Sequence, residues 1–184
     1  MDAKLKWNRK YKDRLLIKES PTPNERLLTL SASLNGGNAL DLACGLGGNS
    51  LFLARHGYRV EALDISDIAI DYLQEQTEKQ RLSIYPRLAD LTDHESLKLL
   101  ENSFDLVVVT YYLDRSLFPL IKSILNDNGF FFMETFYHSP QNKQTVSDSY
   151  KLRPNELLTE FGDFHILYFE ENEEEGRQTI FCRK

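Results

Sequence analysis

Five short apolar segments alternate with helical patterns along this chain, and that alternation constrains its fold more than any other sequence feature. Strands that alternate with amphipathic helices are typical of an α/β fold with a mainly parallel sheet. Pro86 lies inside the third segment, where its missing backbone N–H predicts an edge strand. The fourth segment is apolar almost throughout, as expected of a central strand covered on both faces. The expected strands are 38–43, 59–64, 82–89, 104–110 and 129–136.

The last part of the chain follows a different pattern. A polar loop at 139–153 is long enough to act as a lid, and Pro154 suits the first turn of a short helix. Two further strands, at about 165–170 and 177–183, flank an acidic turn, so we expect them to pair antiparallel. The predicted fold class is α/β: a Rossmann-like, doubly wound, mostly parallel seven-stranded sheet with a C-terminal antiparallel hairpin. With 184 residues and no linker or repeat, the chain is expected to form one domain.

Composition argues against several classes of protein. The 22 basic and 28 acidic residues give a net charge of −6, which disfavours non-specific binding to nucleic acid or anionic membranes. Cys44 and Cys182 have no second cysteine at metal-ligand spacing, so we expect neither a disulfide framework nor a metal site. The sequence shows no secretory signal and no apolar run near the roughly 18 residues of a spanning helix. A soluble cytoplasmic protein without a membrane partner is therefore expected.

Charge is concentrated in two places. Residues 1–18 carry seven Lys or Arg and two Asp, whereas residues 170–175 carry five Glu. Charge runs of this kind are commonly solvated faces. The alternative for the basic segment is that it guides an anionic substrate toward a nearby site.

A glycine-rich turn joins the first expected strand to its helix, in the segment LDLACGLGGN at 40–49. Ligands of doubly wound sheets bind at this place, outside the carboxyl end of a strand and before a helix N-terminus. Gly45 and Gly47 lack a Cβ, so the backbone can approach a ligand closely. The amides of the turn and of the first helical turn would face that ligand as donors.

Carboxylates are expected at the ends of two further strands. Asp64 follows Gly45 by 19 residues, a spacing at which a carboxylate accepts both hydroxyls of a ribose. Asp90 ends the third strand and, with Asp41 and Asp64, would line one side of a ligand crevice. The alternative is that Asp64 and Asp90 only cap the turns that follow them.

The same segment discriminates between nucleotide ligands. A dinucleotide fingerprint that starts at Gly45 requires Gly or Ala at position 50, where this chain has Ser50. No GK[ST] element is present, which excludes a phosphate-cradling loop for nucleoside triphosphates. Asp41, just before the turn, suits a ligand that carries positive charge, such as an amino-acid ammonium or a sulfonium.

These motifs resemble those of class I S-adenosylmethionine-dependent methyltransferases over nearly the whole chain. The segment ALDLACGLGGNSLFLARHGYRVEALDIS resembles the first two motifs of the superfamily, with Ala43 where many members have glycine. FDLVVVTYYLDRSLFPLI and LNDNGFFFMETF resemble its later motifs. The chain is most similar to small bacterial enzymes grouped with tellurite-resistance and thiopurine-type methyltransferases, which share an N-terminal W-x-x-x-Y pattern, here at 7–11.

The resemblance implies a site for S-adenosylmethionine in a single methyltransferase domain, covered by an arm and helix at 1–36. Asp41 would act on the ammonium of the cofactor through amides or water, Asp64 would bind its ribose, and Asp90 would accept from its adenine amino group. Trp7 and Tyr11 would close over the cofactor, or else form an aromatic staple that fixes the arm to the core. The implied cofactor-binding residues are Trp7, Tyr11, Asp41, Ala43, Cys44, Gly45, Gly47, Asp64, Ile65, Asp90, Leu91 and Thr110.

The methyl acceptor is less well defined. An activated methyl donor leaves the protein chiefly to align a nucleophile and exclude water, so a soft anion needs no base. We therefore assign no catalytic base. Tyr112, Arg115 and His138 follow strands four and five and are candidates for acceptor binding. The alternatives are a surface or capping role for Arg115 and an exposed loop position for His138.

The sequence thus predicts a methyltransferase for a small-molecule or small-anion acceptor. One alternative is a module that binds S-adenosylmethionine without turnover. Another is an RNA methyltransferase, which the acidic balance and the absent D/N-P-P-Y/F motif disfavour. Nicotinamide-dependent redox chemistry is disfavoured by Ser50. No oligomeric state is predicted.

Overall fold

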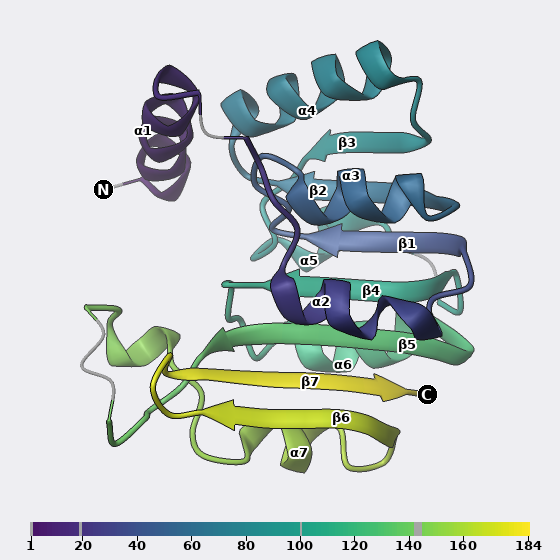
Figure 1. Cartoon of the computed structure of the whole chain (residues 1–184), viewed down its shortest axis with the longest axis vertical. Helices are drawn as coiled ribbons and strands as arrows, with labels where there is room; N and C mark the ends of the chain where they lie inside the picture. Colours follow the sequence, from purple (N-terminus) through teal and green to yellow (C-terminus); the bar gives the residue numbers. More distant parts are fainter. Residues whose placement is uncertain (1, 19, 100, 142–144) are drawn as a thin grey trace. The chain divides into compact units, whose positions relative to one another are not determined.

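A computed structural model describes residues 2–18, 20–99, 101–141 and 145–184. Seven strands form one mixed sheet in the order β3-β2-β1-β4-β5-β7-β6 (Figure 1). This order confirms the predicted fold class. The chain divides into two compact units at the boundary between Lys98 and Leu99.

The first unit contributes three parallel strands, β1 (Gly37–Leu42), β2 (Tyr58–Asp64) and β3 (Ile84–Leu88). β3 is an edge strand, as Pro86 predicted. Only one side of an edge strand is paired, so a residue without a backbone N–H is tolerated there. In Figure 1, α3 and α4 lie in front of these strands. The helices of this unit are α1 (Ala3–Leu16), α2 (Glu25–Leu30), α3 (Gly48–Arg55), α4 (Asp67–Gln80) and α5 (His94–Leu97), with a 3-10 turn, η1, at Ser31–Ser33.

Local sequence explains why α4 forms where it does. The Ser66 hydroxyl caps its first turn by accepting a hydrogen bond from the Ala69 amide at 3.2 Å. Ala69, Leu73 and Thr77 follow at four-residue spacing and are all buried, so one face of the helix packs on the strands. The helix ends at Arg81, which adopts a left-handed conformation.

The short helix α5 begins differently from what the T-x-x-E pattern at 92–95 suggests. The Asp93 carboxylate is the cap, accepting from the Ser96 amide at 3.3 Å. Thr92 instead donates its hydroxyl to Asp90 at 2.7 Å. The cap therefore lies one residue later, because Asp90 takes up the hydroxyl that would have capped the helix.

The second unit contains four strands. β4 (Phe104–Thr110) pairs parallel with β5 (Leu125–Phe136), which starts four residues earlier than expected. β7 (Arg177–Arg183) pairs antiparallel with both β5 and β6 (His165–Asn172), which confirms the C-terminal hairpin. α6 (Leu117–Ile124) and α7 (Glu156–Glu160) lie behind these strands in Figure 1. Leu106, Val107 and Val108 are fully buried, as a strand covered on both faces requires.

The polar loop before α7 is only partly described, since residues 142–144 lie outside the described ranges. A bridge between Tyr137 and Leu152 closes the base of the loop, and a 3-10 turn, η2, occupies Asp148–Tyr150. Pro154 does not stand in the first turn of the helix as expected. It precedes Asn155, whose left-handed backbone (φ 57°) delays the helix to residue 156. The lid function of this loop stays a prediction.

No helix among the described residues combines the length and the apolar character needed to cross a membrane.

Candidate functional site

The glycine-rich turn follows β1 and leads directly into α3. Its backbone is left-handed at Ala43 (φ 56°), Gly45 (φ 54°) and Gly47 (φ 81°). The Cys44 amide donates to the carbonyl of Leu63 at 2.9 Å, which fixes the turn to the end of β2. Three left-handed residues within five positions turn the chain sharply, so that only residues 43–47 separate β1 from α3.

Steric crowding explains two of the glycines. A Cβ on Gly45 would lie 2.9 Å from the Tyr11 hydroxyl, and a Cβ on Gly47 would collide with the Leu73 side chain. Ala43 carries a Cβ in the same left-handed conformation, at a cost of about 1–2 kcal/mol relative to a right-handed residue. That conformation would suit glycine at position 43 better than alanine.

Asp64 links the end of β2 to this turn. One of its carboxylate oxygens accepts from the Gly45 amide at 2.8 Å, and the other accepts from the Ser66 amide at 2.9 Å. The residue is 4% exposed, and burial raises the pKa of its carboxyl, while the hydrogen bonds from Ser66, Gly45 and Ile65 counteract part of that effect. Asp64 is therefore held rigidly against the turn by these amides, and the ribose contact expected from its spacing to Gly45 stays a prediction.

Asp41 is fully buried at the end of β1. The hydroxyl of Ser50, in the first turn of α3, donates to its Oδ2 atom at 2.6 Å. Its Oδ1 atom is buried and accepts no hydrogen bond from any described residue. Burial, together with the nearby charge of Asp64, raises the pKa of Asp41 to about 7, although the Ser50 hydrogen bond lowers it.

Two further groups beside these carboxyls have raised pKa values and stay neutral near pH 7. Burial and the charges of Asp41 and Asp64 raise the pKa of the Cys44 thiol well above its usual value. Burial and the charge of Asp64 likewise raise the pKa of Tyr11, which the positive charge of Arg14 partly offsets. Neither Asp41 nor Asp64 has an ion-pair partner in the described part of the chain. The cluster therefore lacks the cation that would balance it.

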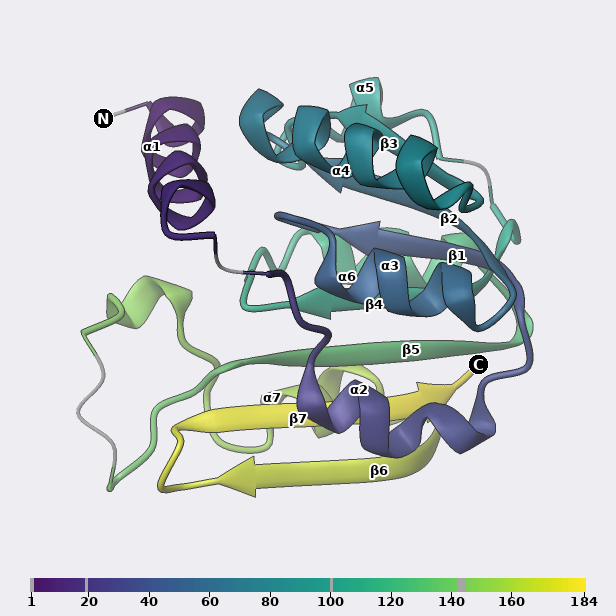
Figure 2. The same cartoon turned by 45° about the horizontal axis from the view of Figure 1, so that its top comes forward.

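Helix α1 lies beside α4 (Figure 2). Its aromatic side chains pack against residues of the glycine turn and of α4. Tyr11 is 7% exposed and packs with Leu46 and Ala69, and the Trp7 ring stacks on it at 5.7 Å between centroids. Two polar contacts anchor the helix: Lys4 pairs with Asp67 at 2.9 Å, and Ser66 donates to Asn8 at 2.6 Å. The contacts fit both the cofactor cover and the aromatic staple expected from the sequence.

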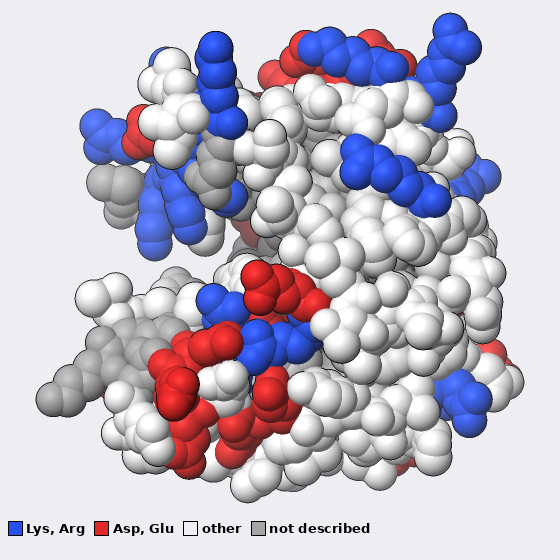
Figure 3. Space-filling model, in the orientation of Figure 1, with Lys and Arg blue, Asp and Glu red and all other residues white. Residues whose placement is uncertain are grey.

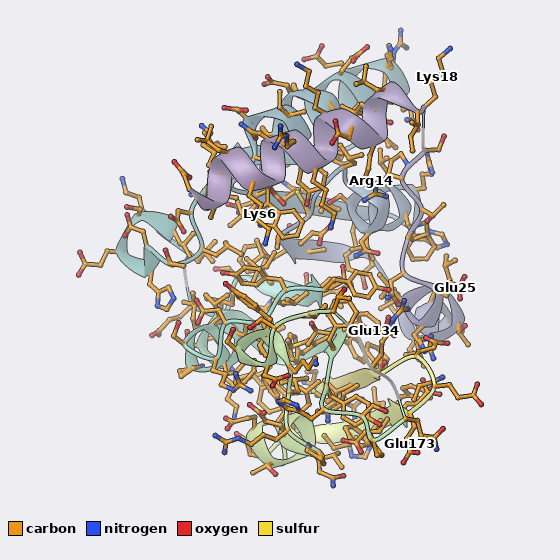
Figure 4. The ribbon with its side chains drawn as sticks, turned by 90° about the vertical axis from the view of Figure 1, so that its left-hand side faces the viewer. Lys6, Arg14, Lys18, Glu25, Glu134 and Glu173 are labelled. Atoms are coloured by element: carbon orange, nitrogen blue, oxygen red, sulfur yellow. The ribbon has the colours of Figure 1, made fainter. Side chains whose placement is uncertain are left out.

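The basic and acidic concentrations are visible on the surface. Lys and Arg side chains gather around α1, whereas Asp and Glu gather around the turn between β6 and β7 (Figure 3). In Figure 4, Lys18 extends away from the end of α1, while Lys6 and Arg14 project from its lower side in that view.

The ends of β2 and β3 meet, because the Ala89 amide donates to the Asp64 carbonyl at 2.9 Å. Asp90 follows directly and is exposed, with its Oδ1 atom accepting from both the amide and the hydroxyl of Thr92. Leu91 is buried and Ile65 is partly buried. The structure thus brings the cofactor residues expected within 1–98 together around one turn, with Asp90 at the strand end beside it.

The remaining candidates lie in the second unit. Thr110 ends β4, and Tyr112 is partly buried just after it. Arg115 makes a bidentate ion pair with Glu156 at 2.5 and 2.9 Å, and it also donates to the Lys151 carbonyl. The face of Arg115 that suits a bidentate anion therefore already holds a carboxylate. His138 is exposed, with Nδ1 3.8 Å from an Asp148 oxygen.

Sequence reasoning missed a buried polar network at the end of β5. Glu134 is fully buried and accepts from the hydroxyls of Tyr111 and Thr179, each at 2.9 Å. Arg177 approaches it at 3.4 Å and lies over the Tyr111 ring. Figure 4 marks Glu134 within this unit. The only sequence signal is a charged residue inside an otherwise apolar strand, because its partners come from two other parts of the chain, the residue after β4 and the strand β7.

Sequence reasoning named Tyr11 as a possible staple but missed the other supports of the glycine turn. Lys4, Asn8, Tyr11 and Leu15 recur at helical spacing, so one face of α1 carries the contacts with α4 and the turn. That spacing could have been found from the sequence. The contact between Ser50 and Asp41 could not, since it depends on how α3 packs back against β1.

Within the described ranges, no group of three or more His, Cys, Asp or Glu side chains is placed to hold a metal ion.

Comparisons with known proteins agree on one family. The model of the family described as "Tellurite resistance protein TehB" matches residues 19–180. A curated relative from Haemophilus influenzae, a probable S-adenosyl-L-methionine-dependent methyltransferase TehB, is 29% identical over 147 residues. The match covers 76% of this chain and 50% of the relative, so the chain spans about half the length of that protein.

Solved structures support the same conclusion. The crystal structure of TehB from Haemophilus influenzae matches with a TM-score of 0.76 and 25% identity, over 95% of this chain and 67% of that one. The [4+2]-cyclase SpnF matches with a TM-score of 0.73 and 16% identity, over 96% and 94% of the two chains, which shows a shared fold alone. Since the family model spans most of the sequence, this chain belongs to the TehB family of tellurite resistance proteins.

Proposed function

We propose that this protein is an S-adenosylmethionine-dependent methyltransferase that acts on a small molecule or small anion. The observation that carries the proposal is the unbalanced acidity of the glycine turn: Asp41 and Asp64 are buried there and lack an ion-pair partner among the described residues. A ligand with an ammonium and a sulfonium supplies the missing positive charge. The names of the Haemophilus influenzae relatives support the same activity.

The residues of the first unit fit the parts of this cofactor. Oδ2 of Asp64 accepts from the Gly45 amide and Oδ1 from the Ser66 amide, and the remaining acceptor capacity of the carboxylate would serve the ribose hydroxyls. Oδ1 of Asp41 is a buried acceptor without a donor, and it would receive the ammonium. The amides at the start of α3 would bind the methionyl carboxylate.

Other residues would complete the cofactor site. Ile65 and Leu91 would pack on the adenine, and Asp90 would accept from its amino group. Trp7 and Tyr11 would cover the turn, as part of an arm at 1–36. Ala43, Cys44, Gly45 and Gly47 would contribute the backbone that contacts the methionyl part, and Thr110 would approach its end.

The cofactor, when bound, supplies a methyl group on a positively charged sulfur. The protein then has to orient the acceptor in line with that group and to keep water out, and orientation alone contributes up to roughly 7–11 kcal/mol. Trp7 and Tyr11 would exclude water from the turn. A soft anionic acceptor needs no general base, so no residue of this chain is assigned to remove a proton.

For the acceptor, Tyr112 and His138 remain proposed contacts. Arg115 would have to exchange Glu156 for the acceptor, because its guanidinium is already bonded on the bidentate side. The net charge of −6 supports a small acceptor over a nucleic acid.

Titration calorimetry of the full chain with S-adenosylhomocysteine tests the cofactor site. Wild-type protein should bind, and Asp64→Ala should weaken binding at least tenfold, equivalent to about 1.4 kcal/mol. Unchanged affinity in Asp64→Ala would overturn the ribose assignment. A screen for transfer of a radiolabelled methyl group to thiols, oxyanions and metabolite pools then tests turnover. Binding without transfer to any acceptor would favour a non-catalytic binding module.

A further inference from the structure

Ser50 has no role in the function described so far, although it is one of the most deeply placed polar residues of the first unit. It stands in the first turn of α3 and is 0% exposed. Its hydroxyl donates to Oδ2 of Asp41 at 2.6 Å. Its presence at position 50, where a dinucleotide fingerprint requires Gly or Ala, is the only feature of Ser50 that the sequence made informative.

The contact leaves the two oxygens of Asp41 in different situations. Oδ2 is satisfied by Ser50, whereas Oδ1 is buried without a donor. A carboxylate here has an uncompensated charge, which is costly in a buried site. A protonated Asp41 would carry its proton on Oδ1, because Ser50 already donates to Oδ2, and that O–H would lack an acceptor among the described residues. Neither protonation state is fully satisfied by the protein alone.

We propose that Ser50 is a positioning residue: by holding Oδ2 of Asp41 it reserves Oδ1 for the cationic end of the cofactor, and cofactor binding releases a proton from Asp41. The inference rests on the proposed function, since it requires a cationic ligand at the glycine turn. A positive charge beside Oδ1 satisfies the carboxylate and not the acid, so bound protein holds fewer protons than free protein.

The other groups around Asp41 make its titration distinguishable. Asp64 faces it from β2, Cys44 from the turn and Tyr11 from α1, where Arg14 contributes positive charge. Cys44 and Tyr11 have raised pKa values and stay protonated below pH 8. Asp64 also has a raised pKa, but it accepts hydrogen bonds from backbone amides on both oxygens. Asp41, whose pKa is raised by burial to about 7, is then the group that changes charge near neutrality.

The test is calorimetry of the full chain with S-adenosylhomocysteine between pH 5.5 and 7.5, in pairs of buffers with different heats of ionisation. The pH range stops at 7.5 because the α-amino group of the ligand would itself begin to lose its proton at about pH 7.7–8.0. The difference between buffers gives the number of protons released. At pH 7 wild-type protein should release about half a proton per ligand, and the dissociation constant should rise toward tenfold per pH unit on the acidic side.

Two variants separate Asp41 from Ser50. Asp41→Asn cannot titrate, so it should lose both the proton release and the pH dependence while it binds more weakly. Ser50→Ala keeps the carboxylate but removes the donor that favours its charged form. Its midpoint should move to higher pH, which weakens binding at pH 7 about fivefold for a shift of one unit. Ser50→Thr retains the hydroxyl and should restore the wild-type pH profile.

Ser83→Ala is the matched control, because Ser83 is exposed between α4 and β3 and should bind as wild-type protein does. Thermal melting of each variant without ligand verifies that it is folded. Absence of binding by the wild type at every pH would overturn the proposed function. Binding without buffer-dependent heat, or an unchanged pH slope in Asp41→Asn, would overturn the inference while leaving the proposed function intact. A Ser50→Ala profile equal to that of Ser83→Ala would overturn the positioning role.

Discussion

The two units of this chain differ in how many hydrogen bonds and cations the fold places beside a buried acidic side chain. In the second unit, Glu134 is fully buried but receives hydrogen bonds from Tyr111 and Thr179 and lies 3.4 Å from Arg177. In the first unit, Asp41 is equally buried, and among the described residues it accepts hydrogen bonds from the uncharged Ser50 alone. One carboxylate is balanced by the fold itself and the other is not.

Glu156, another acidic residue of the second unit, shows the same contrast with Asp41 in its pKa. Burial acts to raise the pKa of Glu156, but the hydrogen bonds and charges of Arg115 and Arg153 outweigh it and leave the pKa lowered. Burial raises the pKa of Asp41 to about 7, since no cation is there to oppose it. Unbalanced buried charge of this kind is concentrated at functional sites. The comparison therefore separates acids that stabilise the fold from acids that are prepared for a cationic ligand.

Replacing Asp41 should have the largest effect on stability. In the folded protein its pKa is about 7, against 3.8 for an aspartate in the unfolded chain, so the folded state binds the proton more tightly. Wild-type stability is then lost as pH rises from about 4 to 7. Asp41→Asn removes that loss, and its advantage in the free energy of unfolding should grow by about 3 kcal/mol between pH 5 and pH 8. Urea unfolding at both pH values measures it; a pH-independent difference would contradict the unbalanced charge.

Gly45→Ala tests the tight backbone beside that charge. Its φ of 54° is unfavourable for alanine, and the new Cβ would lie 2.9 Å from the Tyr11 hydroxyl. We expect a loss of about 1–3 kcal/mol in unfolding free energy, together with weaker binding of S-adenosylhomocysteine. Gly57→Ala is a useful control, since it has a comparable φ of 84° but no atom within 4 Å of the new Cβ. Equal losses in the two variants would remove the argument that Tyr11 packs on the turn.

Arg115→Ala tests the balanced half of the comparison. The Arg115 side chain is 41% exposed and that of Glu156 is 10% exposed, so the pair lies between a surface and a buried ion pair. Its loss should cost about 1–2 kcal/mol, and affinity for S-adenosylhomocysteine should stay unchanged. Lys79→Ala, which breaks the exposed pair with Glu75, should cost less than Arg115→Ala, because solvent screens that pair. A cofactor defect in Arg115→Ala would show that its contacts serve more than the second unit.

Ala43→Gly should have the smallest effect and the opposite sign. Glycine relieves a left-handed strain of about 1–2 kcal/mol but adds about 0.4–1 kcal/mol of entropy to the unfolded chain. A gain of up to about 1 kcal/mol in unfolding free energy is expected, measured by urea unfolding at pH 5, where the charge of Asp41 contributes least. A destabilised variant would mean that the methyl group of Ala43 makes packing contacts that outweigh the strain.

Local signals made much of the fold predictable. Residues 104–110 form a strand with the expected bounds because a buried central strand is continuously apolar. The position of Asp64 at the end of β2 was also expected, whereas its hydrogen bond from the Gly45 amide was not. Long-range pairing was not predictable in the same way. The network of Glu134 depends on the antiparallel register of β5 and β7, which places Thr179 opposite it. The contact of Ser50 with Asp41 likewise depends on tertiary packing, and no spacing rule encodes it.

A crystal structure of the full chain with S-adenosylhomocysteine tests the central claim most directly. The account predicts ligand density beside the turn at 43–47, with both ribose hydroxyls bonded to Asp64 and the ammonium beside Oδ1 of Asp41. Density for the ligand elsewhere, or a turn still filled by the side chains of α1 at saturating ligand, would contradict it.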